Sequence, residues 1–313
     1  MKILLLGANG QLGRNFMEEG SLAKRGELCA ASRDGCCYDG SRIARADLAS
    51  PDTVSDLLDQ LQPDVIVNTA AYTAVDRAQQ EEALAMRINA TAVGLLGQWA
   101  QAHGACVLHY SSDYIFNGTA NTPYAVDATT APLGVYGHSK LVGEMALRES
   151  GAHHILLRTS WVYAPHGHNF LLTMLRMGSA RDALRVVTDQ YGAPTSTALI
   201  VAGTLAALDT WLAAAPNQRR ALEGTHHLVA SGYTNWHGFA GAIFKGAVKR
   251  GLLPRAPRLE AIHSADYPTG AQRPAWSVLD NTGFTVRFGY ALPNWQLALD
   301  GVLDALALGR DRI

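Results

Sequence analysis

The chain has 313 residues, of which 48% are hydrophobic and 17% charged, a composition typical of a globular protein with a full core. Its formal net charge of −1 leaves no basic excess, so neither nucleic acid nor a membrane surface is expected as a partner. The four cysteines are Cys29, Cys36, Cys37 and Cys106. They are too few and too irregularly spaced for a disulfide framework or a zinc site, which predicts reduced thiols in a cytoplasmic protein.

Strands and helices alternate through the first half of the chain. The apolar run at 3–6 predicts a buried parallel strand, and a helix is expected over 12–19. Further strands are predicted at 28–31, 64–68, 105–110 and 155–158, and further helices at 51–61, 81–103 and 136–149. This alternation indicates an α/β fold with a Rossmann-type, doubly wound parallel sheet.

The pattern becomes less regular after about residue 161. Helices are predicted near 168–178, 195–213 and 235–250, with irregular segments between them. We expect a dinucleotide-binding domain over 1–162 and a second, smaller α/β substrate domain mainly over 163–313. The two are expected to be interleaved, because a segment near 184–230 is predicted to return to the first domain, with 184–190 as a strand of the main sheet.

Three glycines follow the first predicted strand and open the first helix. Gly7, Gly10 and Gly13 form a GxxGxxG motif. Glycine is needed where the chain turns tightly, and its missing side chain lets a pyrophosphate approach the free N–H groups of a helix N-terminus. A glycine pattern alone is weak, but the strand-turn-helix context predicts a dinucleotide site.

The end of the second strand favours NADPH over NADH. An acidic residue there would bind the ribose 2′-hydroxyl, whereas a basic one would accommodate a 2′-phosphate. Ser32 and Arg33 occupy this position, and Asp34 lies one residue further on, where it could point away. NADPH is therefore the expected cofactor, with NADH as the alternative.

A phenol and an ammonium group lie four residues apart in the helix predicted at 136–149. Tyr136 and Lys140 share one face of that helix. We expect the ammonium to lower the tyrosine pKa, so that Tyr136 exchanges a proton with the oxygen of a carbonyl that is being reduced. Ser112, at the end of the strand over 105–110, is the expected third member, with Ser111 as its competitor.

These residues resemble the extended short-chain dehydrogenase/reductase superfamily, and more closely the dTDP-4-dehydrorhamnose reductases. The stretches that carry the closer resemblance are PDVIVNTAAYTAVDRA (63–78), HYSSDYIFNG (109–118), YGHSKLVGE (136–144), RTSWVYA (158–164), DQYGAPT (189–195), HLVASGYTNW (227–236) and YPTGAQRP (267–274). They span nearly the whole chain. The resemblance implies reduction of the C4 carbonyl of dTDP-4-dehydro-L-rhamnose by NAD(P)H, the last step in making dTDP-L-rhamnose for cell-surface polysaccharide such as lipopolysaccharide.

The same resemblance implies the residues of the site. Cofactor contacts carry over to Gly10, Gln11, Leu12, Ser32, Asp47, Leu48, Ala71, Tyr72 and Thr73. Substrate contacts carry over to Ser112, Asp113, Tyr136 and Trp161, and Arg273 is the expected diphosphate ligand because a guanidinium can bind two phosphate oxygens at once. Asn169 and Gln190 are weaker candidates for the cleft.

No metal is expected. Some members of the family join two subunits through a magnesium ion held by glutamates, but the matching positions here are Asn15, Ala198 and Gln296, none of which is a carboxylate. A homodimer, if formed, would therefore lack this bridge. The eleven histidines show no metal-ligand spacing such as HExxH.

Two other functions remain open on sequence grounds. One is a reductase or epimerase of another nucleotide-linked sugar. A 4,6-dehydratase of the same superfamily is disfavoured, because a dehydratase needs an Asp-Glu pair and Asp113 is followed by Tyr114. A non-catalytic NADP-binding regulatory subunit is the alternative from another class. Retention of Ser112, Tyr136 and Lys140 together disfavours it.

Overall fold

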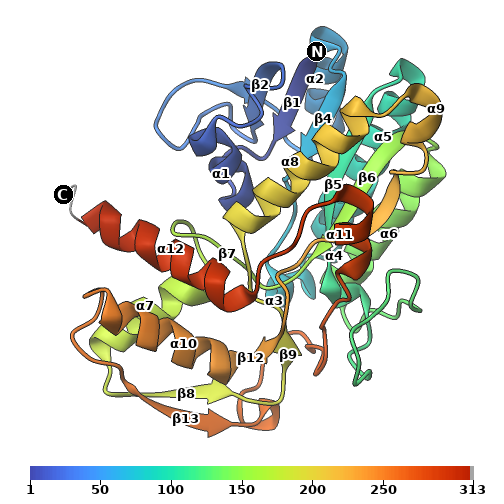
Figure 1. The fold of residues 1–313 in the computed structure, drawn as a ribbon. Helices are drawn as coiled ribbons and strands as arrows, with labels where there is room; N and C mark the ends of the chain where they lie inside the picture. Colours follow the sequence, from blue (N-terminus) through green and yellow to red (C-terminus); the bar gives the residue numbers. More distant parts are fainter. Residues whose placement is uncertain (311–313) are drawn as a thin grey trace.

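A seven-stranded parallel sheet forms the centre of the protein in the computed structural model, which describes residues 1–310 (Figure 1). The strand order is β11-β6-β5-β4-β1-β2-β3. The strands are β1 (Lys2–Leu6), β2 (Glu27–Ser32), β3 (Ala44–Arg45), β4 (Val65–Asn68), β5 (Cys106–Ser112), β6 (His153–Thr159) and β11 (Gly224–His227). The order reverses between β1 and β4, so the doubly wound, Rossmann-type fold is confirmed.

Helices cover both faces of this sheet. They are α1 (Gln11–Glu19), α2 (Pro51–Leu61), α3 (Val75–Ala78), α4 (Glu82–Met86), α5 (Ala92–His103), α6 (Val135–Glu149), α8 (Thr197–Ala213) and α9 (Pro216–Arg219), with a π-helix η1 (Arg87–Thr91) between α4 and α5 and a 3-10 turn η2 (Asp113–Ile115) after β5. Ile3 and Leu5 pack in the cluster that holds Phe16 of α1 and Leu208 of α8, whereas Leu4 and Leu6 join the cluster that holds Leu58 and Leu96. This division follows from the alternation of side chains along a strand.

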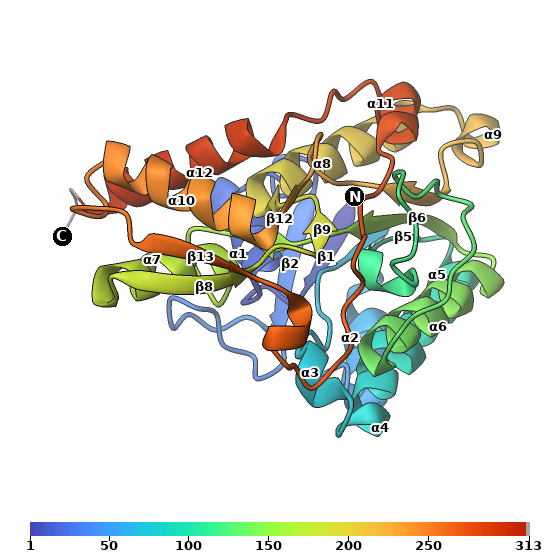
Figure 2. The ribbon, with the colours of Figure 1, turned by 90° about the horizontal axis from the view of Figure 1, so that it is seen from below.

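Most of the remaining elements gather on one side of the sheet, beyond its carboxyl edge (Figure 2). They are β7 (Val162–Tyr163), α7 (Phe170–Ala180), β8 (Ala183–Val187), β9 (Tyr191–Gly192), β10 (Thr195–Ser196), β12 (Thr234–Asn235), α10 (Trp236–Lys249), β13 (Arg258–Ile262), η3 (Ser264–Asp266) and α12 (Trp295–Arg310), whereas one further helix, α11 (Thr282–Phe288), lies apart from them. α12 packs along α10, and α11 lies back against α8 and β11.

One predicted strand is in a different sheet. The prediction that 184–190 returns to the main sheet is wrong, because β8 pairs with β13 in a separate two-stranded parallel sheet. The strand that returns is β11, which extends the main sheet next to β6. An apolar run predicts a strand but not its partner, since partner choice depends on long-range packing. The domain boundary at residue 162 stays a prediction.

Candidate active site

The glycine turn has the geometry that a pyrophosphate site needs. Gly7 has a φ of +83°, and a Cβ at Gly13 would lie 2.1 Å from the carbonyl oxygen of Gly7. Gly10 precedes α1 and provides no side-chain cap, so the first N–H groups of this helix are not satisfied by a capping side chain. Because a Cβ would close the approach to these groups, the turn fits an anion.

The loop after β2 closes onto the same turn. The buried Ser32 Oγ lies 2.9 Å from Asp34 Oδ1 and 2.8 Å from the carbonyl oxygen of Cys36, which also accepts a 2.7 Å bond from Asn9 Nδ2. Asp34 therefore faces Ser32 rather than pointing away. Arg33 is exposed. Asp47, in the next loop, accepts a bond from the backbone N–H of Ala49 at 3.0 Å, and its neighbour Leu48 is buried.

Tyr136 lies beside Ser112, where the first turn of α6 meets the end of β5. Burial raises the pKa of Tyr136, hydrogen bonding with the Ser112 side chain lowers it and the charge of Asp113 raises it, to a net value of about 12. The expectation that Lys140 lowers this pKa is wrong, because burial dominates and Lys140 is turned to other partners. A phenol with so high a pKa stays protonated at neutral pH, which is the state that a proton donor requires.

The Ser112 hydroxyl is held by its neighbours on η2. Its Oγ donates to Asp113 Oδ1 at 3.0 Å and accepts from the backbone N–H of Tyr114 at 3.2 Å. Burial raises the pKa of Asp113 to about 6, against hydrogen bonds with the Ser277 and Ser112 side chains, which lower it. Ser111 is also buried, but successive strand residues point to opposite faces, so it cannot share the position of Ser112.

Lys140 is almost fully buried beneath Tyr136. Its Nζ donates to the carbonyl oxygen of Tyr110 at 2.6 Å and lies 3.3 Å from His109 Nε2. Burial lowers the pKa of Lys140 to about 8, against the opposing charge of Glu144. That carboxylate is itself bound by Arg158, at 2.9 and 2.8 Å.

The sequence did not identify Asn89, which ties α6, the helix of Tyr136 and Lys140, to the expected cofactor segment 71–73. Its side chain accepts from the Tyr72 N–H at 2.9 Å and donates both to the Tyr72 carbonyl oxygen and to Ser139 Oγ at 3.0 Å. Ser139 in turn donates to the carbonyl oxygen of Tyr136. Asn89 lies in the π-helix η1 within the region predicted as one helix over 81–103, and apolar spacing gives no sign of it.

A cavity of about 770 Å³ opens between α7, β8 and the segment around Tyr267. Phe170, Met174, Trp236, Gln190 and Arg273 are among its lining residues. Arg273 Nη2 donates to Asp76 Oδ2 at 2.8 Å. Gln272 and Pro274, the neighbours of Arg273, line a much smaller space beside Tyr136. Arg273 thus stands between the large cavity and Tyr136.

Trp161 and Trp236 form a stacked pair at the boundary of this cavity. Their ring centroids are 3.4 Å apart with an interplanar angle of 1°, and Trp161 has the unusual φ of +46°. Trp236 Nε1 donates to Gln190 Oε1 at 3.1 Å. One face of Trp161 is therefore covered by Trp236, which itself lines the cavity.

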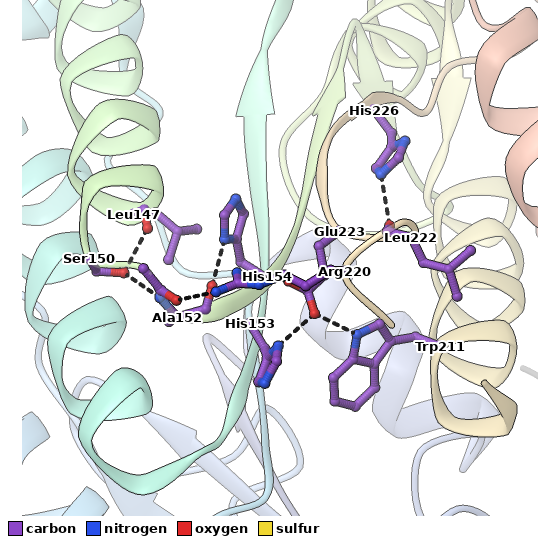
Figure 3. Close-up of polar contacts among 11 residues, drawn as sticks. Leu147, Ser150, Ala152, His153, His154, Trp211, Arg220, Leu222, Glu223 and His226 are labelled. Carbon is purple, nitrogen blue, oxygen red and sulfur yellow. Dashed lines mark hydrogen bonds and ion pairs between the residues drawn. The ribbon is translucent and has the colours of Figure 1, made fainter. Parts of the chain in front are cut away.

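A second polar cluster lies at the opposite, amino edge of the sheet (Figure 3). Glu223 accepts bonds from Arg220 and Trp211 and pairs with His153 at 2.6 Å, and His226 bonds to the carbonyl oxygen of Leu222.

No group of three or more His, Cys, Asp or Glu side chains within residues 1–310 is arranged to hold a metal ion. No helix in this range is long and apolar enough to span a membrane.

Comparison with known proteins finds relatives over nearly the whole chain. The model of the RmlD substrate binding domain family matches residues 1–308. The chain belongs to this family. It is 42% identical to the dTDP-4-dehydrorhamnose reductase of Burkholderia thailandensis over 306 residues (96% of this chain, 97% of the relative) and 41% identical to that of Shigella flexneri (98% of each).

Solved structures of family members have the same fold. A dTDP-4-dehydrorhamnose reductase from Clostridium acetobutylicum superimposes with a TM-score of 0.85 at 31% identity, covering 98% of this chain and 99% of the other. The enzyme of this name from Bacillus anthracis, solved in complex with NADP, gives a TM-score of 0.84 at 27% identity, covering 97% and 99%.

Proposed function

We infer that the protein reduces the C4 carbonyl of dTDP-4-dehydro-L-rhamnose to give dTDP-L-rhamnose. The observation that carries this inference is the alignment of three features: a cavity large enough for a nucleoside, Arg273 at its edge and Tyr136 beyond. A nucleotide-linked sugar has its base, diphosphate and sugar in the same order. The names of the full-length relatives support the same substrate.

The residues of the glycine turn fit a dinucleotide. Gly10, Gln11 and Leu12 would present backbone N–H groups to the pyrophosphate, since the turn has no side chain at Gly7, Gly10 or Gly13 to block it. Asp47 and Leu48 would lie near the adenine. Ala71, Tyr72 and Thr73, which follow β4, would also contact the cofactor. Bound NADPH would supply the hydride for the carbonyl carbon.

Tyr136 would give the proton. Its phenol, kept protonated by burial, would donate to the carbonyl oxygen as negative charge develops there, while Ser112 Oγ holds the same oxygen by a hydrogen bond. Lys140 would hold the nicotinamide ribose. The carbonyl carbon gains the hydride and the oxygen gains the proton, so the product is an alcohol and the cofactor leaves oxidised.

The substrate would be held from both sides of the cleft. Arg273 would bind the diphosphate, because its buried Nε has no hydrogen-bond partner in the described part of the chain. The Asp113 carboxylate would accept a bond from a sugar hydroxyl, and Trp161 would pack on the sugar or base. Gln190 Nε2 donates to Ser264 Oγ and Asn169 Nδ2 donates to Gln11 Oε1, and of the two residues Gln190 lines the cavity.

NADPH is the proposed cofactor. Ser32 and Arg33 suit a 2′-phosphate, and a relative at 27% identity was solved with NADP.

We also propose a cytoplasmic enzyme whose assembly does not need magnesium. The three positions where the family can hold magnesium are Asn15, Ala198 and Gln296, and none of these residues has a carboxylate. The Asn15 amide donates to Glu19 at 2.7 Å. A dimer that EDTA dissociates in sedimentation equilibrium would contradict this.

Product identification tests the proposed function. The purified protein is offered dTDP-4-dehydro-L-rhamnose, made in situ by the preceding epimerisation, with NADPH or NADH. We expect one mole of NADPH consumed for each mole of dTDP-L-rhamnose formed. Conversion without net cofactor oxidation would indicate an epimerase, and nucleotide-cofactor binding with no turnover on any dTDP-, UDP- or GDP-linked keto sugar would indicate a regulatory subunit.

A further inference from the structure

Three buried polar residues form a chain beneath the catalytic helix. Asn68 of β4, His109 of β5 and Lys140 of α6 are each no more than 2% exposed. Asn68 Nδ2 lies 3.1 Å from His109 Nδ1, and Lys140 Nζ lies 3.3 Å from His109 Nε2. Both ring nitrogens of His109 therefore face a nitrogen, and the ring cannot accept a hydrogen bond from both neighbours in its ordinary neutral form.

The backbone fixes which way the Asn68 amide points. Asn68 Oδ1 accepts a 3.1 Å bond from the N–H of Ala70, so its Nδ2 must face His109 and donate to Nδ1. The ring is neutral, because burial holds the pKa of His109 well below its usual value. A neutral imidazole carries one hydrogen. With Nδ1 as the acceptor, that hydrogen lies on Nε2 and points at Lys140.

An Nε2–H group cannot accept a bond from an ammonium group, but it can donate to the lone pair of an amine. The other charged group acting on Lys140 is Glu144, on the same helix, and its carboxylate is already bound by Arg158 of β6 and contacted by Arg148. The carbonyl oxygen of Tyr110 accepts from either form of the lysine. The arrangement around Lys140 thus lowers the affinity of its amine for a proton.

We propose that His109 is a positioning residue that lowers the proton affinity of Lys140 in the free protein through its Nε2–H tautomer. This rests on the proposed function, in which Lys140 holds the cofactor ribose. The charged lysine needs the opposite tautomer, and Asn68 can satisfy that tautomer only by reversing its amide and releasing Ala70. Ala70 directly precedes the expected cofactor segment 71–73, so the charge of Lys140 is linked to the conformation of that segment.

Nitrogen-15 NMR of the wild-type protein tests the tautomer directly. We expect the His109 ring to show a protonated Nε2 and an unprotonated Nδ1 in the free protein. A protonated Nδ1 would overturn the proposal. This readout does not depend on turnover, so a failure of the reductase assignment leaves it valid, and the wrong tautomer leaves the reductase assignment standing.

The pH profile tests the effect on Lys140. His109→Met removes the N–H donor while filling the space, and we expect it to raise the pH at which kcat/KM falls on the alkaline side by about one unit. The matched control is His154→Met, at a buried histidine on the amino edge of the sheet, which should leave this pH unchanged. If kcat/KM of His109→Met fell at the same alkaline pH as in the wild type, or at a lower pH, the proposal would be contradicted.

Discussion

The side-chain amide of Asn169 donates a 2.7 Å hydrogen bond to the side-chain oxygen of Gln11, joining the first turn of the expected cofactor helix α1 to α7, a helix that lines the large cavity. The Asn169 side chain also caps α7 by accepting from the N–H of Leu172. His166 and Gly167, in the same loop, contact Gln11 as well. This loop therefore positions the start of α1 relative to the cavity.

Asn169→Ser should weaken cofactor binding while keeping α7 capped, because serine can accept the capping bond but cannot reach Gln11. We expect the KM for NADPH to rise roughly fivefold, the loss of about one hydrogen bond. Asn235→Ser is the control, since Asn235 caps α10 in the same way but donates to Thr188. Equal KM values for the two variants would refute this role for Asn169.

Gly137→Ala should disrupt the site through the backbone. A Cβ at Gly137 would lie 2.1 Å from the carbonyl oxygen of Tyr114, so α6 and η2 would have to separate and Tyr136 would leave Ser112. We predict loss of most turnover and a lower melting temperature. Gly241→Ala on α10 has an ordinary 3.8 Å contact and should be neutral or stabilising by about 0.5–1 kcal/mol. Thermal unfolding and kcat measured on both variants decide the matter.

Arg33→Ala should reduce the preference for NADPH. The exposed guanidinium is the positive charge expected beside a 2′-phosphate, and Asp34 would remain next to Ser32 to favour a 2′-hydroxyl. The ratio of kcat/KM for NADPH over NADH should fall about tenfold at low salt, with NADH kinetics little changed. If both cofactors lose equally, Arg33 contributes to the fold rather than to cofactor choice.

The buried histidines make the fold sensitive to acid. Burial lowers the pKa of both His226 and His227 from 6.5 to about 4, so the unfolded chain binds more protons than the folded one between these values. Stability should therefore fall as the pH drops from 6.5 towards 4, by on the order of 3 kcal/mol for each histidine at the lower limit. His226→Gln, which keeps a donor for the Leu222 carbonyl (Figure 3), should flatten this fall in urea unfolding, whereas exposed His138→Gln should not.

Local patterns in the sequence predicted most of the sheet and pointed to the main parts of the candidate site. The apolar run over 3–6 and the glycines after it are consecutive, so strand, turn and helix could be located without tertiary information. Tyr136 and Lys140 are four residues apart on one helix. The roles of Asn89 and His109 could not be foreseen in this way, because each depends on contacts 17 to 50 residues away along the chain.

Long-range effects also explain the two errors. β8 was assigned to the main sheet because an apolar run does not specify its partner strand, and the partner, β13, lies about 75 residues further on. The Tyr136 pKa was expected to fall because helical spacing suggested only the nearby charge. Burial is a property of the whole fold, and here it outweighs any local charge.

The most direct test of the account is Tyr136→Phe, measured in single turnover with NADPH and the dTDP-linked 4-keto sugar. Phenylalanine keeps the ring and removes only the hydroxyl. The account predicts a rate lower by about 10²–10⁴-fold with NADPH affinity unchanged, and wild-type turnover in the control Tyr290→Phe. Reduction at the wild-type rate by Tyr136→Phe would contradict the assignment of Tyr136 as the proton donor.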